Sequence, residues 1–228
     1  MTEVFIFCGG KGTRIKDFNS DLPKPLIKIN GKPLVCYIIE KYLDIGANKI
    51  VLLTGFKHEY FLKNKFLRKY KEVKICYTGL NSSVFERLKK VKNQILNEYF
   101  YFTYGDSYAE LNLMKTMTKT IKSKKLLSVT TSDYKLPFGS FVFKNDSRIV
   151  SYKEKKILDI NSGYYVASKK IFKFAHICKS LERDLIPLLI YKNQCIRSTK
   201  VKNWFPVDDK NTYERFKKFI DKKNLKKT

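Results

Sequence analysis

The chain has 228 residues, of which 43% are hydrophobic, so it is long enough and apolar enough to form one compact domain with its own core. Its 47 Lys and Arg residues against 21 Asp and Glu give a formal net charge of +26, a balance typical of proteins that bind nucleic acids, membrane surfaces or anionic substrates. The lysines are scattered through every segment and the aromatic residues fall at strand or helix periodicity. We therefore expect no nucleic-acid or membrane partner, and a positive field that favours a small anionic substrate.

The cysteines and the N-terminus indicate a reducing compartment. No pair of Cys or His residues has metal-ligand spacing, and no basic stretch followed by an apolar one resembles a secretion signal. The five cysteines are far apart and mostly have apolar neighbours, which predicts free, buried thiols. They are Cys8, Cys36, Cys76, Cys178 and Cys195. We expect a cytoplasmic location.

The first predicted element is a buried strand at residues 4–7, which runs into the loop Cys-Gly-Gly-Lys-Gly-Thr-Arg at residues 8–14. Glycines let a backbone approach a ligand closely, so that successive N–H groups can point at phosphate oxygens. Thr13 adds a hydroxyl, and Arg14 adds a planar fork that suits phosphate. The spacing matches neither a Walker A motif nor a dinucleotide fingerprint. Alone, the loop could equally be a tight turn after a strand.

The next segment, residues 22–34, places Lys24 between two prolines and ends in Gly-Lys-Pro-Leu at the head of a predicted helix. The prolines fix the backbone on either side of Lys24 and hold the segment extended, which would present the ammonium group of Lys24. This favours a functional lysine. The alternative is an ordinary exposed loop lysine in a lysine-rich chain.

Strands and helices then alternate through the first half of the chain. We expect helices at 34–43, 58–70 and 84–95, and strands at 49–54, 73–78 and 99–104. Such alternation is typical of a mostly parallel sheet with helices on both faces, which binds ligands at the carboxyl ends of its strands. Gly105 and Asp106 come at such an end. The Asp106 carboxylate could hold Mg²⁺ or could cap a helix, and the sequence alone favours neither.

The second half has a different pattern. A strand is expected at 126–132, followed by a hairpin of 137–143 and 148–152 around an Asn-Asp-Ser turn. Glu154 and Lys155 follow the hairpin, Asn161 precedes an aromatic strand, and Asp208 precedes a last helix that begins near residue 211.

Taken together, Gly-Gly-x-Gly-Thr-Arg, Pro-Lys-Pro and Gly-Lys-Pro-Leu resemble the nucleotidyltransferases that activate sugar phosphates. The Thr-Gly at 78–79, the Arg-Leu-Lys at 87–89 and the Phe-Thr-Tyr-Gly-Asp at 102–106 resemble the glucose-1-phosphate cytidylyltransferase branch. The resemblance covers residues 4 to about 219. It implies an α/β fold with a Rossmann-like, mixed, mostly parallel sheet flanked by helices, as in GT-A-like enzymes, and a small β-rich lobe on the acceptor side. It also implies a single domain, 1–228, with a nucleotide-binding half at 1–133 and an acceptor-binding half at 134–228.

The resemblance implies roles for individual residues. Arg14 and Lys24 would be catalytic, Asp106 and Asp208 would hold Mg²⁺, and CTP would give CMP to a small phosphorylated acceptor with release of pyrophosphate. The nucleotide would bind at Gly9, Gly10, Gly12, Thr13, Arg14, Gly79 and Arg87. The acceptor would bind at Gly139, Glu154, Lys155 and Asn161. A homo-oligomer would also be in keeping with this family.

Departures from the family pattern leave the acceptor open. Val84, Phe85 and Glu86 replace small residues before the arginine, Lys156 replaces a proline, and Ser162 replaces a glycine. The acceptor is either a sugar 1-phosphate or a non-sugar phosphate, such as the phosphorylated glutamine of capsule phosphoramidate synthesis. UTP, GTP or dTTP with a hexose or heptose 1-phosphate is an alternative. So is a non-catalytic nucleotide-binding regulatory domain, because fold does not fix function.

Overall fold

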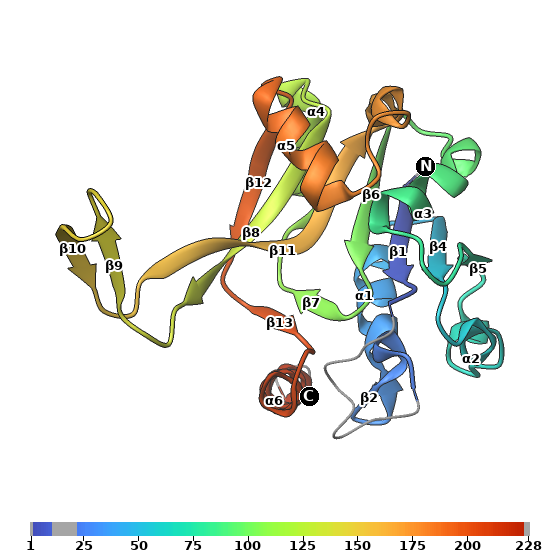
Figure 1. The fold of residues 1–228 in the computed structure, drawn as a ribbon. Coiled ribbons are helices and arrows are strands. Elements are labelled where there is room, and N and C mark those ends of the chain that lie inside the picture. Colours follow the sequence, from blue (N-terminus) through green and yellow to red (C-terminus); the bar gives the residue numbers. More distant parts are fainter. Residues whose placement is uncertain (1, 11–21, 226–228) are drawn as a thin grey trace.

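A seven-stranded sheet forms the centre of the molecule in this computed structural model, which describes residues 2–10 and 22–225 (Figure 1). Its strands, in spatial order, are β12 (Cys195–Val201), β8 (Leu127–Lys135), β11 (Ile157–Ser168), β6 (Tyr99–Tyr104), β1 (Glu3–Cys8), β4 (Lys49–Thr54) and β5 (Val73–Tyr77). Strand β11 runs antiparallel to both of its neighbours, and every other neighbouring pair is parallel. The predicted mixed, mostly parallel sheet is confirmed.

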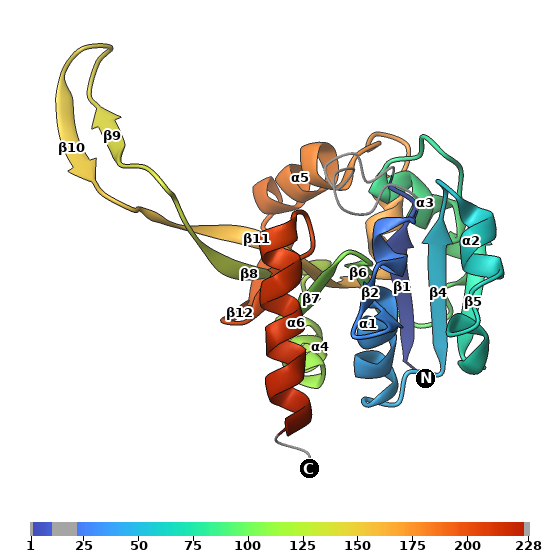
Figure 2. The ribbon, with the colours of Figure 1, turned by 90° about the horizontal axis from the view of Figure 1, so that it is seen from below.

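Helices cover both faces of this sheet, so its central strands are buried on both sides. Along β1, Val4 and Ile6 belong to one core cluster, whereas Phe5 and Phe7 belong to another. The first cluster includes residues of α1 (Leu34–Leu43) and α6 (Lys210–Leu225), and α4 (Leu113–Ser123) contacts β8, β11 and β12. The second includes residues of α3 (Val84–Lys90) and α5 (Ile186–Tyr191). Figure 2 shows α6 and α5 beside the sheet.

The helix predicted at 58–70 is broken into α2 (His58–Leu62) and a 3₁₀ turn at Leu67–Lys69. The side-chain oxygen of Asn64 accepts hydrogen bonds from the backbone N–H groups of Phe66 at 3.0 Å and Leu67 at 3.3 Å. Such a local turn competes with the helical hydrogen bonds. The helix predicted at 84–95 is also shorter than expected: α3 ends at Lys90, and a 3₁₀ turn follows at Lys92–Gln94. The helix at 34–43 and the three strands of the first half are present with similar bounds.

Several short elements were not predicted. They include β2 (Lys28–Ile29), β3 (Lys32–Pro33), β7 (Ser107–Ala109), β13 (Trp204–Pro206), 3₁₀ turns at Lys24–Leu26, Lys92–Gln94 and Lys169–Phe174, and a π-helical turn at Leu181–Leu185. The pairing of β13 with β7 brings the segment before α6 alongside the segment after β6.

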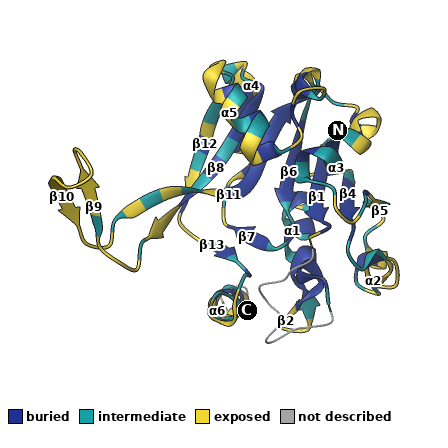
Figure 3. Ribbon diagram, viewed as in Figure 1, coloured by how far each residue is buried: buried dark blue, intermediate teal, exposed yellow. Residues whose placement is uncertain are grey.

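The predicted hairpin is confirmed as β9 (Ser140–Phe143) and β10 (Ile149–Lys153). Together with the outer ends of β8 and β11 it forms an arm, residues 134–157, that projects away from the body of the molecule (Figures 1 and 2). Almost every residue of the arm is exposed (Figure 3). The small β-rich lobe expected on the acceptor side is this two-stranded arm.

All five cysteines are free thiols, as predicted, with Cys8, Cys36 and Cys178 buried and Cys76 and Cys195 half-buried. Among the described residues, no helix has the length and apolar character needed to span a membrane.

Candidate active site

The candidate site begins where β1 and β6 end side by side. The backbone N–H of Gly105 donates to the carbonyl of Phe7 at 2.9 Å, which holds the end of β6 against β1. A Cβ on Gly105 would lie 2.8 Å from the Sγ of Cys8 and 2.9 Å from the Phe7 oxygen, so only glycine fits there. This close packing fixes the position of the next residue, Asp106, at the carboxyl end of the parallel strands.

Asp208 reaches the same place from the far end of the chain. Because β13 pairs with β7, the backbone N–H of Val207 donates to the carbonyl of Asp106 at 2.9 Å. The next carboxylate, that of Asp208, forms an ion pair with the Nζ of Lys24 across 184 positions of sequence. Lys24 is only 8% exposed, so it is not an ordinary surface lysine. The structure therefore brings Lys24, Asp106 and Asp208 together.

Arg87 lies buried behind this strand end. Its guanidinium donates to the carbonyl of Thr54 at 2.9 Å, the hydroxyl of Thr78 at 2.7 Å and the carbonyl of Gly9 at 3.1 Å. A Cβ on Gly9 would lie 2.2 Å from the guanidinium carbon. Arg87 thus ties the ends of β1, β4 and β5 together from within. Its predicted contact with the nucleotide stays a prediction.

The other predicted nucleotide-binding residues lie in the same region or outside the described residues. Gly79 follows β5 with a φ of +98°, which favours glycine, and its carbonyl would lie 2.5 Å from a Cβ on Gly55 after β4. Gly10 is exposed, and a Cβ there would meet open space. Gly12, Thr13 and Arg14 lie outside the described residues.

Of the predicted acceptor residues, Asn161 lies near the strand end. The register of β11 shifts between Asn161 and Tyr165, and the side-chain amide of Asn161 donates to the hydroxyl of Tyr165. That hydroxyl lies 3.5 Å from the hydroxyl of Tyr104, the last residue of β6. Burial raises the pKa of Tyr165 to about 12, so it stays a neutral hydrogen-bonding group at physiological pH.

Glu182 is a neighbour of this network that the sequence did not reveal. It accepts a hydrogen bond from the Tyr104 hydroxyl and comes from the π-helical turn at Leu181–Leu185, which was not predicted. Burial, together with the nearby Tyr165 and Glu182, raises the pKa of Tyr104. Nothing in the local sequence around Glu182 distinguishes it from a surface glutamate.

The remaining predicted acceptor residues are on the arm. Gly139 precedes β9, and a Cβ there would lie 2.4 Å from the Tyr152 hydroxyl. Glu154 and Lys155 form the turn between β10 and β11 and lie 3.7 Å apart as a solvent-exposed ion pair. The structure therefore separates Gly139, Glu154 and Lys155 from Lys24 and Asp208.

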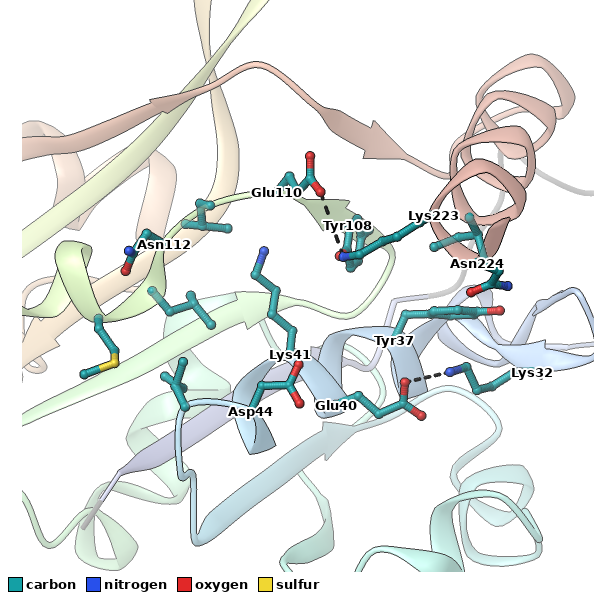
Figure 4. A pocket seen from close by; sticks show the side chains of 15 residues that line it. Lys32, Tyr37, Glu40, Lys41, Asp44, Tyr108, Glu110, Asn112, Lys223 and Asn224 are labelled. Atoms are coloured by element: carbon teal, nitrogen blue, oxygen red, sulfur yellow. Dashed lines mark hydrogen bonds and ion pairs between the residues drawn. The ribbon is translucent and has the colours of Figure 1, made fainter. Parts of the chain in front are cut away.

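A cavity of about 730 Å³ lies apart from this site, between α1, α6 and residues 108–114 (Figure 4). None of the predicted site residues lines it. Lys41 projects into it beside Glu110 and Lys223, and burial, with a smaller effect from Lys223, lowers the pKa of Lys41 to about 8. The arrangement of Lys24, Asp106 and Asp208 at the strand ends is the better candidate for chemistry, because ligands of such sheets bind there.

Asp106 and Asp208 provide carboxylate oxygens, the ligand type that Mg²⁺ prefers, and the Val207–Asp106 backbone bond keeps the two residues close. In the part of the chain that the structure describes, no group of three or more His, Cys, Asp or Glu side chains could hold a metal ion. A pair of carboxylates still fits Mg²⁺, which takes its other ligands from water and substrate phosphates.

The sequence profile of the family described as Nucleotidyl transferase matches residues 3–196 of this chain. The chain belongs to this family. The resemblance drawn from the glycine loop and the Pro-Lys-Pro segment is thereby confirmed. The family match covers residues 3–196 as a whole and gives no role to any single residue. The catalytic, nucleotide-binding, metal-binding and acceptor-binding assignments therefore stay predictions.

Family relatives differ in the nucleotide that their names give. A Bacillus subtilis (strain 168) protein named probable glucose-1-phosphate cytidylyltransferase is 32% identical over 196 residues, covering 75% of this chain and 77% of the relative. The D-glycero-alpha-D-manno-heptose 1-phosphate guanylyltransferase of Campylobacter jejuni is 30% identical over 179 residues, again covering 75% and 77%. The crystal structure of HddC from Yersinia pseudotuberculosis superposes with a TM-score of 0.74 at 26% identity, covering 96% of this chain and 100% of that one.

Proposed function

We propose that this member of the Nucleotidyl transferase family moves CMP from CTP onto a sugar 1-phosphate and releases pyrophosphate. The observation that carries the proposal is the Lys24–Asp208 ion pair beside Asp106, at the carboxyl ends of β1 and β6. It places a buried cation and two carboxylates next to the glycine loop, and this combination suits a triphosphate. The cytidylyltransferase and guanylyltransferase relatives support both the reaction type and the sugar 1-phosphate.

The reaction needs no nucleophile from the protein. A phosphate oxygen of the acceptor attacks the α-phosphorus of the nucleotide, a new P–O bond forms, and the bond to the β-phosphate oxygen breaks as pyrophosphate leaves. The protein contributes positioning and neutralisation of charge. Lys24 is held in one place by Pro23, Pro25 and Asp208, so its ammonium can offset negative charge on the phosphate under attack.

The proposal includes Mg²⁺, which Asp106 and Asp208 would hold. The ion would supply positive charge to the triphosphate oxygens when bound. In its absence the Asp208 carboxylate is neutralised by Lys24, so the charge of this carboxylate is balanced in the free protein. Asp106 comes from the rigid end of β6, and Asp208 is anchored through the Val207 backbone bond.

A second candidate is transfer of GMP from GTP to a heptose 1-phosphate. It is favoured by the guanylyltransferase of Campylobacter jejuni, which is nearly as similar to this chain as the Bacillus subtilis protein. The described part of the glycine loop does not distinguish cytosine from guanine, because phosphate binding by backbone N–H groups is independent of the base.

The experiment is a pyrophosphate-release assay with Mg²⁺, in which CTP, GTP, UTP, ATP and dTTP are each paired with glucose 1-phosphate, a heptose 1-phosphate and phosphorylated glutamine. We expect release with CTP and a sugar 1-phosphate. Release only with GTP and heptose 1-phosphate would support the second candidate. Release only with phosphorylated glutamine would overturn the sugar acceptor, and CTP binding without release from any pair would favour a non-catalytic domain.

A further inference from the structure

The helices α4 and α5 expose large apolar side chains where they end, at one end of the sheet (Figures 1 and 3). Tyr191, the last residue of α5, is 88% exposed, and Ile190 beside it is 62% exposed. Ile121, in the last turn of α4, is 46% exposed. None of the three belongs to the candidate active site. Exposed apolar side chains that lie together mark interaction surfaces.

The two helix ends lie side by side, although α4 and α5 pack on opposite faces of the sheet. Leu126, after α4, donates its backbone N–H to the carbonyl of Gln194, after α5, at 3.1 Å. The Nζ of Lys125 donates to the carbonyl of Asn193 at 2.6 Å. These bonds join the two turns into one surface.

This surface, residues 119–125 and 190–194, is called the α4–α5 tip, and it is basic. It contains no Asp or Glu, and neither do the longer segments 111–132 and 185–207 to which it belongs. The lysine-rich helix α6 differs, because Glu214 and Asp221 lie among its lysines. The positive charge of the tip is therefore not balanced by carboxylates of its own segments. The lysines of the tip are Lys119, Lys122, Lys124, Lys125 and Lys192.

One carboxylate lies further along the same end of the sheet. Glu98, just before β6, accepts a hydrogen bond from the hydroxyl of Ser168 at 2.7 Å and lies 3.7 Å from the Nζ of Lys170. Ser168 also donates its backbone N–H to the carbonyl of Leu126 at 2.9 Å, which links this position to the tip. Because Glu98 has its own partners, it leaves the lysines of the tip available to an anionic surface.

We propose that the α4–α5 tip binds the surface of a bilayer that contains anionic lipids. Lysines attract the negative head groups, and exposed tyrosine and isoleucine side chains enter the boundary between head groups and acyl chains. The exposed aliphatic side chains favour a bilayer over a nucleic acid, because a phosphate backbone offers them no apolar contact. The expectation of no membrane partner rested on lysines scattered along the sequence, and the fold brings these five together.

The tip is at the far end of the sheet from the candidate active site. It adjoins the first residues of β8 and β12, which run in the same direction as β6, whereas the candidate site lies where β1 and β6 end. A protein bound through the tip would leave Lys24 and Asp208 facing away from the bilayer. The proposal therefore does not rest on the proposed function, and it is tested without nucleotide.

Co-sedimentation with lipid vesicles tests the proposal. We expect the protein to sediment with vesicles of phosphatidylcholine and phosphatidylglycerol and to stay in solution with vesicles of phosphatidylcholine alone. High salt should release it, because salt screens the attraction between lysines and head groups. Sedimentation with neither kind of vesicle, or equal sedimentation with both, would overturn the proposal.

Two matched double variants test whether the tip is the surface that binds. Lys122 and Lys124 are exposed at the end of α4, and Lys63 and Lys65 are exposed with the same spacing at the end of α2. We expect Lys122→Glu with Lys124→Glu to lower the partition coefficient onto anionic vesicles by at least ~10², because both changes reverse a charge at the contact. Lys63→Glu with Lys65→Glu alters the net charge equally and should lower it only a few-fold. Equal effects would overturn the proposal.

The apolar part of the contact is tested with Tyr191→Ser. We expect this change to lower the partition coefficient about ten-fold, because it removes an aromatic side chain from the head-group boundary. Tyr134→Ser, which removes a 46% exposed tyrosine from the arm, is the control and should have little effect. Equal partition of Tyr191→Ser and the unmodified protein would contradict insertion of the tip.

A nucleic acid is the competing partner for a basic surface, and fluorescence anisotropy with duplex DNA distinguishes it. We expect any binding of DNA to be weakened to the same extent by the two double variants, since DNA would respond to net charge alone. DNA binding that only Lys122→Glu with Lys124→Glu weakens, in a protein that does not sediment with anionic vesicles, would assign the tip to nucleic acid and overturn the bilayer.

Discussion

Arg87 shows how one buried side chain shapes the nucleotide side of the site. Its guanidinium joins Gly9, Thr54 and Thr78, which belong to the ends of three neighbouring strands. Position 9 therefore favours glycine, because a Cβ there would have to displace the guanidinium. A displaced Arg87 would leave a buried charge without its hydrogen-bond acceptors, which is expensive.

Gly9 and Gly10 allow a matched test of this packing. We expect Gly9→Ala to lower the free energy of unfolding by about 2–3 kcal/mol through overpacking against Arg87. Gly10→Ala meets open space and should change the free energy of unfolding by less than about 1 kcal/mol. Urea unfolding of both variants measures the difference. Equal losses would show that Arg87 does not constrain the loop.

At the scale of elements, a buried carboxylate links the amino-terminal ends of the central strands, at the end of the sheet opposite the candidate site. Glu3, the first residue of β1, accepts hydrogen bonds from Lys49 of β4 at 3.0 Å and from the backbone of Leu96 and Asn97, just before β6, at 2.8 and 2.7 Å. Burial by itself would raise the pKa of Glu3, but the bonds from Asn97, Lys49 and Leu96 outweigh it and hold the pKa below its ordinary value. The charged form is thus the one that the fold stabilises.

The sign of the pH effect follows from this lowered pKa. The contribution of Glu3 to stability is present above the pKa of the unfolded chain, near 4.5, and is lost as pH falls through the lower pKa of the folded state. We expect Glu3→Gln to lower the free energy of unfolding by about 2 kcal/mol at pH 7 and to make its decline below pH 5 shallower. The exposed Glu59→Gln is the control. A parallel acid decline in Glu3→Gln and the parent would contradict this role.

For the whole molecule, the sequence predicted the sheet better than the site. The strands at 49–54 and 99–104 are mostly apolar or aromatic and end in glycine-containing turns, so their bounds were readable from local pattern. The helix α4 was not predicted: it has only four apolar residues among eleven, and two of its three buried residues, Thr116 and Thr120, are polar. A local sequence pattern predicts a strand or helix only when enough apolar residues lie within that strand or helix itself.

The arrangement of the site depends on contacts that no local pattern contains. Lys24 and Asp208 meet across 184 positions because β7 and β13, each of three residues, pair with one another. Family resemblance suggested which residues belong to the site. It could not show that Lys24 is buried against Asp208 or that Glu154 and Lys155 are on a projecting arm. The direction of that arm follows from the long β8–β11 ribbon, a tertiary feature.

The central claim is that Lys24 acts on the phosphates of a nucleotide, and the most direct test is the rate of pyrophosphate release by Lys24→Ala beside Lys28→Ala, an exposed lysine four positions on. The account predicts a fall in kcat/KM of at least ~10² for Lys24→Ala, as for other single electrostatic groups, with Lys28→Ala within about two-fold of the parent. Lys24→Ala within a few-fold of the parent would contradict the account.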